Sequence, residues 1–470
     1  MSIKWTIKTY KYLSSKTKTI YEIFIHNSCF RSPSKTRKWA EHLCFAFIVI
    51  FNLSSWIDLN SVWVELPLIV NSAPEGWTLP STLSLVISLA NIFPVLVVLL
   101  RWKLGSRFSE IPFIYTIIIV GILACCSIGL FWNWTVHVFN HETSLPLIIA
   151  VFCLAILDCT SSLVFCDFMR HFKAKYLSAM FFGEGLTATL PTLIAFAQGV
   201  GGEAQCFRNN QTGNFEPIYS KPRFSVSVFF YLVTGIIGIS LFAFMLLRFT
   251  SIVRLAKADD IIDRKNTIET YEMLLKAEEQ VAPIRKASLS TPNSLTKKQY
   301  YILQSFNVVN SAILYGCLPT LITYSLLPYG QKAFYYCSIL YPVSYPLSSF
   351  YAIFRPTISD LSVILGSIFG TLVCLFIIAI AFQSPCPIWA DTLHGGILMT
   401  CAWFLSSFTL AYVRIASGNR IKLAWKKQNG LFYFGLSVQL GIIFGVVPMY
   451  LVINVYKLLE DREPCKSYCL

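Results

Sequence analysis

Acidic and aromatic side chains interrupt the first long apolar stretch of this sequence, and their chemistry needs an explanation. Asp58 and Glu65 lie seven residues apart, so on a helix they share one face, whereas Asn60 and Trp63 share another. A charged side chain at the centre of a membrane costs on the order of 3 kcal/mol. We therefore predict that this helix faces protein or a chamber rather than lipid, and that Glu65 contacts a ligand.

Other apolar stretches carry polar or aromatic side chains that could contact the same ligand. For a lone amide or hydroxyl, a hydrogen bond between two helices is the alternative interpretation. With Asn60, Trp63 and Glu65, the predicted substrate contacts are Asn91, Glu184, Thr187, Asn310 and Tyr315.

Two prolines follow aromatic residues at the same spacing, in Trp63-Val64-Glu65-Leu66-Pro67 and Tyr315-Gly316-Cys317-Leu318-Pro319. A proline removes the hydrogen bond to the carbonyl four residues back and kinks the helix. Proline-interrupted helices in corresponding positions of two halves point to a transport site. Coincidence is the alternative, because membrane helices tolerate proline. We predict a site between these two helices.

The sequence gives little support for catalysis. Its six histidines form no metal-ligating pair with carboxylates in an apolar stretch, and no glycine-rich phosphate loop occurs. His137 and His141 are four residues apart, but in a short loop where a surface pair is the simpler interpretation. We therefore expect no metal, no cofactor and no enzymatic activity.

The composition is that of a membrane protein. Hydrophobic residues make up 55% and charged residues 13%, against about a quarter charged in a soluble domain. A membrane-spanning helix needs about 20 apolar residues. We predict an all-α integral membrane protein with eleven spans, near residues 43–70, 81–101, 111–133, 145–168, 176–199, 224–249, 299–327, 333–354, 359–382, 389–413 and 430–456.

The order of the spans predicts two bundles joined by a long polar loop. The predicted segments are a basic cytosolic leader (1–42), a six-helix bundle (43–249), a cytosolic linker (250–298), a five-helix bundle (299–456) and an extracellular tail (457–470). A mitochondrial transit peptide is the alternative for the basic leader.

The basic residues indicate the orientation. The chain has a net charge of +14, and a cytosolic N-terminus places 31 of the 38 Lys and Arg on the inner side. Cytosolic loops of membrane proteins carry such an excess. The charge therefore needs no nucleic-acid partner, and eleven spans leave the C-terminus outside.

Four cysteines fall on the predicted outer side: Cys206, Cys386, Cys465 and Cys469. An oxidising compartment permits disulfides, and we expect one between Cys386 and the C-terminal tail; free thiols are the alternative. Asn210-Gln211-Thr212 is a glycosylation pattern in the longest predicted outer loop.

Several motifs together resemble the eukaryotic riboflavin transporter family. They lie in order along the chain at residues 63–67, 74–81, 181–186, 327–330 and 384–387. The resemblance implies an eleven-helix plasma-membrane carrier, similar in fold to the equilibrative nucleoside transporters and so major-facilitator-like. It also implies sodium-independent riboflavin uptake, with pH sensitivity in some members.

Riboflavin suits the predicted site. Aromatic side chains can stack on its flat ring, Asn60 or Asn91 can pair with its imide, and Glu65 can accept a hydrogen bond from the imide or a ribityl hydroxyl. We expect two bundles that rock around this site within the lipid bilayer. The alternatives are a carrier of nucleosides or other planar heterocycles, and a non-transporting receptor.

Overall fold

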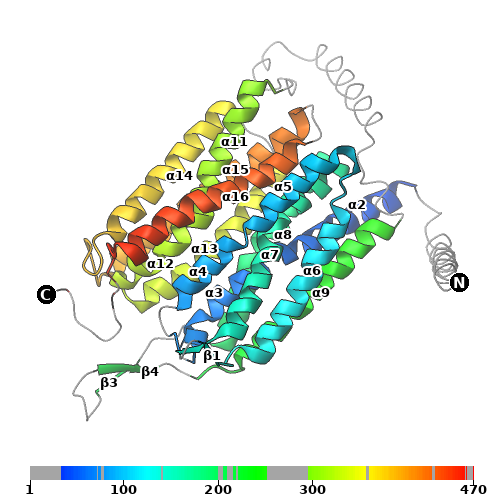
Figure 1. Ribbon diagram of the computed structural model, residues 1–470. Helices are drawn as coiled ribbons and strands as arrows, with labels where there is room; N and C mark the ends of the chain where they lie inside the picture. Colours follow the sequence, from blue (N-terminus) through cyan, green and yellow to red (C-terminus); the bar gives the residue numbers. More distant parts are fainter. Residues whose placement is uncertain are drawn as a thin grey trace, which may run out of the picture.

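The computed structural model describes residues 33–70, 72–75, 79–138, 141–199, 205–208, 215–218, 221–250, 295–355, 359–425, 429–460, 462 and 469. These residues are mostly helical, and the long helices run side by side along one common direction (Figure 1). Several predictions fall on residues outside this set: most of the leader, the linker and the tail, together with Asn210 and Cys465. Cys206 lies in a described strand, but its side chain is not described.

The first half of the molecule, residues 33–250, holds eight α-helices and two short hairpins. Val136 pairs with Thr143 in one hairpin, and Gln205 pairs with Ile218 in the other. The elements are α2 (Pro33–Asn52), η1 (Leu53–Ser55), α3 (Ile57–Val70), α4 (Leu79–Leu89), α5 (Ile92–Leu104), η3 (Gly105–Arg107), α6 (Ile111–Phe131), β1 (Val136–Val138), β2 (His141–Thr143), α7 (Leu145–Phe168), η4 (Met169–His171), η5 (Ala174–Tyr176), α8 (Leu177–Gln198), β3 (Gln205–Arg208), β4 (Phe215–Ile218) and α9 (Val226–Phe249).

The second half, residues 295–460, is helical throughout its regular structure. Two of its segments are π-helical, at residues 312–317 and 451–455. The elements are α11 (Lys297–Ser311), η7 (Ala312–Cys317), α12 (Leu318–Leu326), η8 (Leu327–Tyr329), α13 (Gln331–Phe354), α14 (Asp360–Ala381), α15 (Leu393–Ala424), α16 (Gly430–Tyr450) and η9 (Leu451–Val455).

Many of these helices are long and apolar enough to cross a bilayer. Within the described ranges, nine meet that condition, and the bent pair Lys38–Ser55 and Ile57–Val70 makes a tenth if it is one span. Helix α13 has 24 residues, including two internal prolines, and is not among them. The chain is therefore a multi-pass helical membrane protein.

The first span bends where the sequence did not predict a bend. Its two parts meet at 50° around residues 53–56, whereas Pro67 lies inside α3 without interrupting it. In the second half, the turn that precedes Pro319 is the π-helix η7 rather than a simple kink. A π-helix contains an extra residue per turn and is often found at functional sites.

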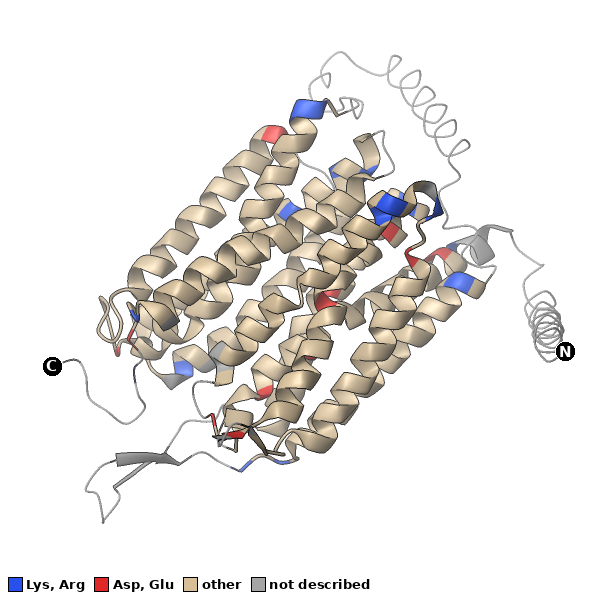
Figure 2. Cartoon of the chain, viewed as in Figure 1, with Lys and Arg blue, Asp and Glu red and all other residues tan. Residues whose placement is uncertain are grey.

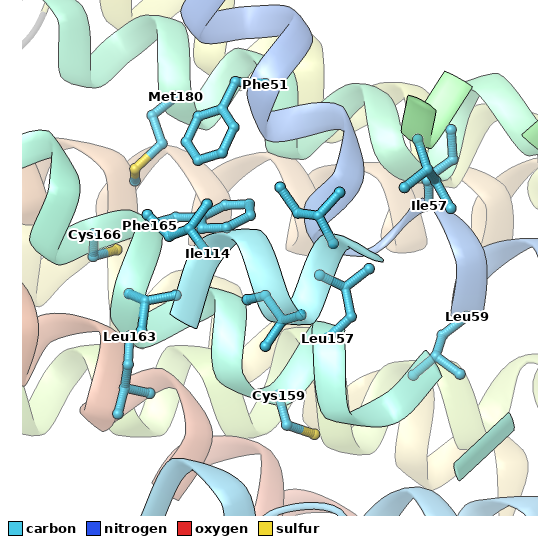
Figure 3. Close-up of a cluster of buried hydrophobic side chains, with 14 of the residues drawn as sticks. Phe51, Ile57, Leu59, Ile114, Leu157, Cys159, Leu163, Phe165, Cys166 and Met180 are labelled. Atoms are coloured by element: carbon cyan, nitrogen blue, oxygen red, sulfur yellow. The ribbon is translucent and has the colours of Figure 1, made fainter. Parts of the chain in front are cut away.

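Two hydrophobic cores hold the helices together. The larger runs through the first half and continues into residues of α11, α13, α14, α15 and α16. In this core the centroid of the Phe51 ring lies 4.3 Å from that of Phe165 and 5.0 Å from that of Phe244. Figure 3 shows Phe51 and Phe165 among the buried side chains of the first half. The second core is confined to the second half. The larger core thus joins the two halves, and the second half has a core of its own.

Charged residues gather near the helix ends, with a few in the middle of the molecule (Figure 2). Helices α5 and α7 end, and α11 begins, at the same end of the molecule. Arg101, Arg170 and Lys297 lie there, so we call it the basic end. The other end is called the opposite end. It contains the starts of α13 and α15.

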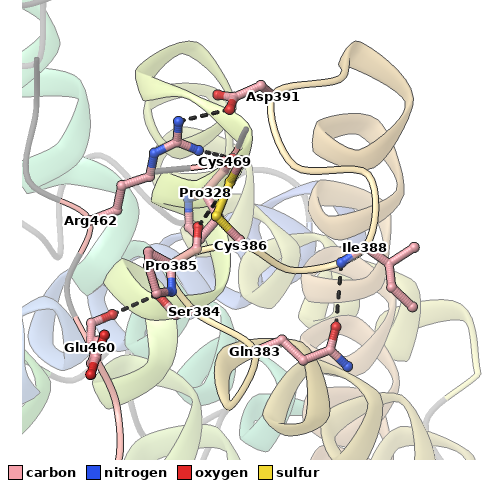
Figure 4. The surroundings of a disulfide bond; sticks show 10 residues. All are labelled: Pro328, Gln383, Ser384, Pro385, Cys386, Ile388, Asp391, Glu460, Arg462 and Cys469. Atoms are coloured by element: carbon pink, nitrogen blue, oxygen red, sulfur yellow. Dashed lines mark hydrogen bonds and ion pairs between the residues drawn. A yellow bond between two sulfur atoms is a disulfide. The ribbon is translucent and has the colours of Figure 1, made fainter. Parts of the chain in front are cut away.

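A disulfide joins the C-terminal tail to the opposite end of the second half. Cys386 bonds to Cys469, with 5.7 Å between their Cα atoms (Figure 4). Arg462 strengthens this attachment, since it donates to the carbonyl of Pro328 at 2.7 Å and pairs with Asp391 at 2.7 Å. The structure thus contains the bond expected between Cys386 and the tail.

Candidate functional site

Helix α3 has two chemically different faces, as the residue spacing predicted. Asp58 and Glu65 are completely buried. Asn60 and Trp63 lie on a different face, where Trp63 is 39% exposed. Trp56, which directly precedes α3, is four residues from Asn60 and seven from Trp63, so the same face includes it.

This face of α3 lies against helix α8. The Asn60 side-chain amide donates to the Thr187 hydroxyl at 3.3 Å. Thr187 in turn donates to the backbone carbonyl of Glu184 at 2.6 Å, one turn earlier in α8. Asn60 and Thr187, two of the predicted site residues, are therefore in direct contact. Thr187 is in turn bonded to the backbone of a third, Glu184.

Glu184 forms an ion pair with an arginine of the other half of the molecule. The Arg414 Nη2 atom lies 3.0 Å from Glu184 Oε1 and 3.4 Å from Oε2. The two side chains are only 2% and 12% exposed, for Arg414 and Glu184. This pair joins α8 to α15 inside the protein, where an opposite charge must offset the cost of burial.

Two tyrosines add hydrogen bonds to this pair. Tyr315, in the π-helix η7, donates to Glu184 Oε1 at 3.5 Å and accepts from Arg414 Nη1 at 3.1 Å. Tyr345 of α13 also accepts from Arg414 Nη1. Tyr315 and Glu184 were predicted from sequence as separate candidates, and the structure brings them together.

Aromatic rings surround the ion pair. The Trp56 and Tyr315 rings come from opposite halves, and they lie almost parallel at 4° with 6.2 Å between their centroids. The Arg414 guanidinium lies 5.3 Å from the Phe181 ring and 5.4 Å from the Tyr315 ring, within cation–π range. We call Trp56, Glu184, Tyr315, Tyr345 and Arg414 the interface cluster.

The glycines beside Glu184 explain how α8 reaches both halves. A Cβ atom at Gly183 would lie 2.4 Å from the carbonyl oxygen of Val49 in α2. One at Gly185 would lie 2.8 Å from the backbone nitrogen of Pro346 in α13. The two glycines thus let α8 pack closely against both helices, while the Glu184 carboxylate contacts Arg414 of α15 and Tyr315 of η7.

Glu65 lies away from the interface cluster. Its carboxylate is within the first half, where the Gln198 amide approaches it at 3.5 Å. This placement does not support the direct ligand contact that the sequence suggested for Glu65. Asp58 and Asp158, both completely buried, face each other in the same half, from α3 and α7.

Asn91 and Asn310 also have local partners. Asn91 marks the break between α4 and α5, and its amide donates to the Ser88 carbonyl at 3.3 Å. The Asn310 amide donates to Ser367 of α14 at 3.1 Å, within the second half. The Asn310 contact is thus a hydrogen bond between two helices, whereas the Asn91 contact is local to its own span.

The ring parallel to Tyr315 is that of Trp56, which the sequence analysis did not select, whereas Trp63 was a predicted substrate contact. Trp56 and Trp63 are seven residues, or about two helical turns, apart on the same face. The prediction relied on Pro67 as the kink. The actual bend lies next to Trp56 and places its ring between the halves.

Sequence reasoning missed Arg414 and Tyr345. The tenth span was predicted to end at residue 413, so Arg414 was counted among the basic residues of a cytosolic loop. Helix α15 instead continues to Ala424, and Arg414 is 1% exposed. Small residues after it, such as Ser417 and Gly418, could have indicated that close helix packing continues.

A second set of polar contacts joins the halves at the basic end. Arg101 of α5 pairs with Asp167 of α7 at 2.5 Å, donates to Asn429 at 3.1 Å and lies 4.0 Å from the Phe432 ring centroid. Lys422 of α15 donates to the Arg170 carbonyl at 2.6 Å. The halves are thus held together from the interface cluster to the basic end.

Glu110, in the turn before α6, also takes part in the polar contacts at the basic end, and its partners lie in the first half of the molecule. Burial opposes ionisation of its carboxyl, but His171 at 2.9 Å and the Arg170 charge outweigh that effect and hold the pKa of Glu110 below its ordinary value. The Glu110 carboxylate is therefore held as an anion beside His171 and the Arg170 guanidinium. Across the described ranges, no group of three or more His, Cys, Asp or Glu residues is placed to hold a metal ion.

The fold defines the class of the protein. It resembles the human organic anion transporter MFSD10, with a TM-score of 0.53 and 11% identity over 90% of this chain and 94% of that one. It also resembles the proton:xylose symporter XylE, with a TM-score of 0.54 and 11% identity over 91% of this chain and 90% of that one. The chain has the fold of the major facilitator superfamily of membrane transporters.

The sequence comparisons identify the family. The model of solute carrier family 52, riboflavin transporter, matches residues 40–461. Member 3-A of Danio rerio is 33% identical over 90% of this chain and 98% of its own, and member 3 of Homo sapiens is 31% identical over 91% and 99%. The chain belongs to solute carrier family 52. This confirms the resemblance predicted from its motifs and places the chain among transporters rather than enzymes.

Proposed function

We propose that this protein carries riboflavin into cells across the plasma membrane by alternating access. Relatives that align over nearly their whole length are named riboflavin transporters. The major-facilitator fold supplies two halves that can rock against each other. An uptake route for an uncharged, flat vitamin is the function that best fits both findings.

The interface cluster is the observation that supports a site for this substrate. Transport sites of this kind lie between the two halves of a carrier, at mid-membrane depth. The cluster combines rings from both halves with a few hydrogen-bonding groups, which is the composition of a small-molecule site. Asn60 and Thr187 continue its polar surface along α3 and α8.

The contacts between the halves support a carrier that is closed at its basic end. Most of the hydrogen bonds that link the halves lie between the interface cluster and that end; examples are Gln439 to Ser162 at 2.9 Å and Ser349 to the Phe181 carbonyl at 3.1 Å. Gly435 also lets α16 pack directly on the backbone of Ser162. Release at the basic end would require these contacts to separate.

Our proposal includes a topology of eleven spans in a six-plus-five arrangement, with α13 as the eighth. Its support is the packing of α13 along α8 and α15, between other candidate spans. The excess of Lys and Arg supports a cytosolic basic end and N-terminus. The C-terminal tail, with the disulfide, is then extracellular, and so is Asn210 as a glycosylation site.

Labelled riboflavin uptake tests this function. The full chain would be expressed in riboflavin-auxotrophic cells that lack their own carrier, and uptake would be normalised to surface abundance. We expect saturable uptake that lumiflavin inhibits and nucleosides do not. Inhibition by nucleosides alone would favour a nucleoside carrier. No uptake with normal surface abundance would contradict the proposal and favour a receptor.

A further inference from the structure

The ion pair of the interface cluster presents an acceptor and a donor side by side. The Glu184 carboxylate accepts hydrogen bonds, and the Arg414 guanidinium only donates them. The two groups lie 3.0 Å apart, and each belongs to a different half of the molecule. A ligand that binds both groups must therefore carry a donor next to an acceptor on one edge.

Both charges have hydrogen-bonding capacity left for such a ligand. The Nε atom of Arg414 is buried and has no hydrogen-bond partner among the described residues. In the described part of the chain, oxygen Oε2 of Glu184 has only the longer contact with Arg414, at 3.4 Å. A buried donor without a partner costs free energy, so a ligand carbonyl placed there would be favoured.

Insertion of a ligand edge between the two side chains would not leave a buried charge alone. When the halves separate, the direct contact between Glu184 and Arg414 must break, and an isolated buried charge is strongly destabilising. An edge with N–H beside C=O replaces each lost bond with an equivalent one. The same ligand ring could lie against Trp56 or Tyr315, whose planes are parallel.

We infer that Glu184 and Arg414 determine substrate specificity by binding the N–H and adjacent C=O of a cyclic imide on a flat ring system. This inference rests on the proposed function and identifies the part of riboflavin that is recognised. The imide N–H donates to Glu184, and a neighbouring carbonyl accepts from Arg414. The ribityl chain then extends away from the pair.

Substitution of the imide N–H by a methyl group provides a direct test with the unaltered protein. N3-methylriboflavin keeps the ring and the ribityl chain but cannot donate to Glu184. We expect it to inhibit labelled riboflavin uptake at least about tenfold more weakly than unlabelled riboflavin, because a buried acceptor would be left unpaired. Equal inhibition by the two compounds would overturn the inference and leave riboflavin transport itself intact.

A matched pair of variants assigns the effect to the interface cluster. Glu184→Leu removes the acceptor, so it should raise the KM for riboflavin and reduce the discrimination against N3-methylriboflavin to within about threefold. Glu65→Leu makes the same chemical change in another buried carboxyl, and it should keep the full discrimination. Full discrimination in Glu184→Leu, or loss of discrimination in Glu65→Leu, would overturn the inference. Absence of riboflavin uptake in the wild type would instead contradict the proposed function.

Discussion

Glu65 and Glu184 are both carboxylates in the first half of the molecule, and their surroundings assign them different tasks. Glu65 is completely buried and approached by the Gln198 amide, within its own half. Glu184 lies where the halves meet, and its partner is the Arg414 guanidinium. Under the proposed alternating access, only the Glu184 carboxylate lies at the interface that would open, so its interactions can be coupled to transport.

The difference follows from the directions in which the two helices present these residues. On α3, Glu65 is on the face opposite to the one that carries Asn60 and Trp63. On α8, the residues on either side of Glu184 are glycines that pack against α2 and α13. The two acids therefore differ in whether they face the interface between the halves.

Loss of Arg414, the partner of Glu184, should have the largest effect on riboflavin uptake. Arg414→Ala leaves the Glu184 charge buried and unpaired, which costs about 3–5 kcal/mol. Because about 1.4 kcal/mol corresponds to tenfold, we expect riboflavin uptake per surface molecule to fall by roughly a hundredfold or more. Arg420→Ala is the matched control on the same helix. Its partner Asp360 is 41% exposed, so uptake should change little; a similar loss in both variants would contradict the prediction.

Exchange of the two charges tests whether uptake depends on the ion pair or on each residue independently. Glu184→Arg alone places two arginines together, and we expect no measurable uptake. Adding Arg414→Glu restores the opposite charges in reversed order, and uptake should recover by about tenfold or more over the single variant. Surface abundance is measured in parallel. No recovery, at equal abundance, would mean that each residue acts independently.

Truncation of the ring at the bend should have an intermediate effect. Trp56→Ala removes a ring that faces Tyr315, and stacking of a flat ring is worth about 1–3 kcal/mol. We expect the KM for riboflavin to rise about tenfold, while Trp56→Phe stays within about threefold. Trp63→Ala, on the same face of α3, should raise the KM less. A larger effect of Trp63→Ala than of Trp56→Ala would favour Trp63, the substrate contact predicted from sequence, over Trp56.

Neutralisation of the other carboxylate should have the smallest effect. Glu65→Gln keeps a hydrogen-bonding side chain next to Gln198, outside the interface between the halves. We expect KM and maximal uptake within about twofold of the wild type, in line with the modest net worth of a single hydrogen bond. A strong loss of uptake at normal surface abundance would show that Glu65 takes part in transport.

Much of this protein follows from local sequence pattern. Apolar stretches near 20 residues determine the long helices, and the bias of Lys and Arg predicts which end faces the cytosol. The seven-residue spacing of Asp58 and Glu65 was enough to assign them one face of α3. The motifs identified the family, because they are short stretches whose order along the chain is visible without a structure.

Contacts between distant segments were decided only by the tertiary structure. Arg414 meets Glu184 across 230 residues of chain, and no periodicity within either helix specifies that pairing. The bend at residues 53–56 selects Trp56 over Trp63 as the partner of Tyr315. Helical spacing fixes which residues share a face, but the neighbour of that face depends on how all the helices pack together.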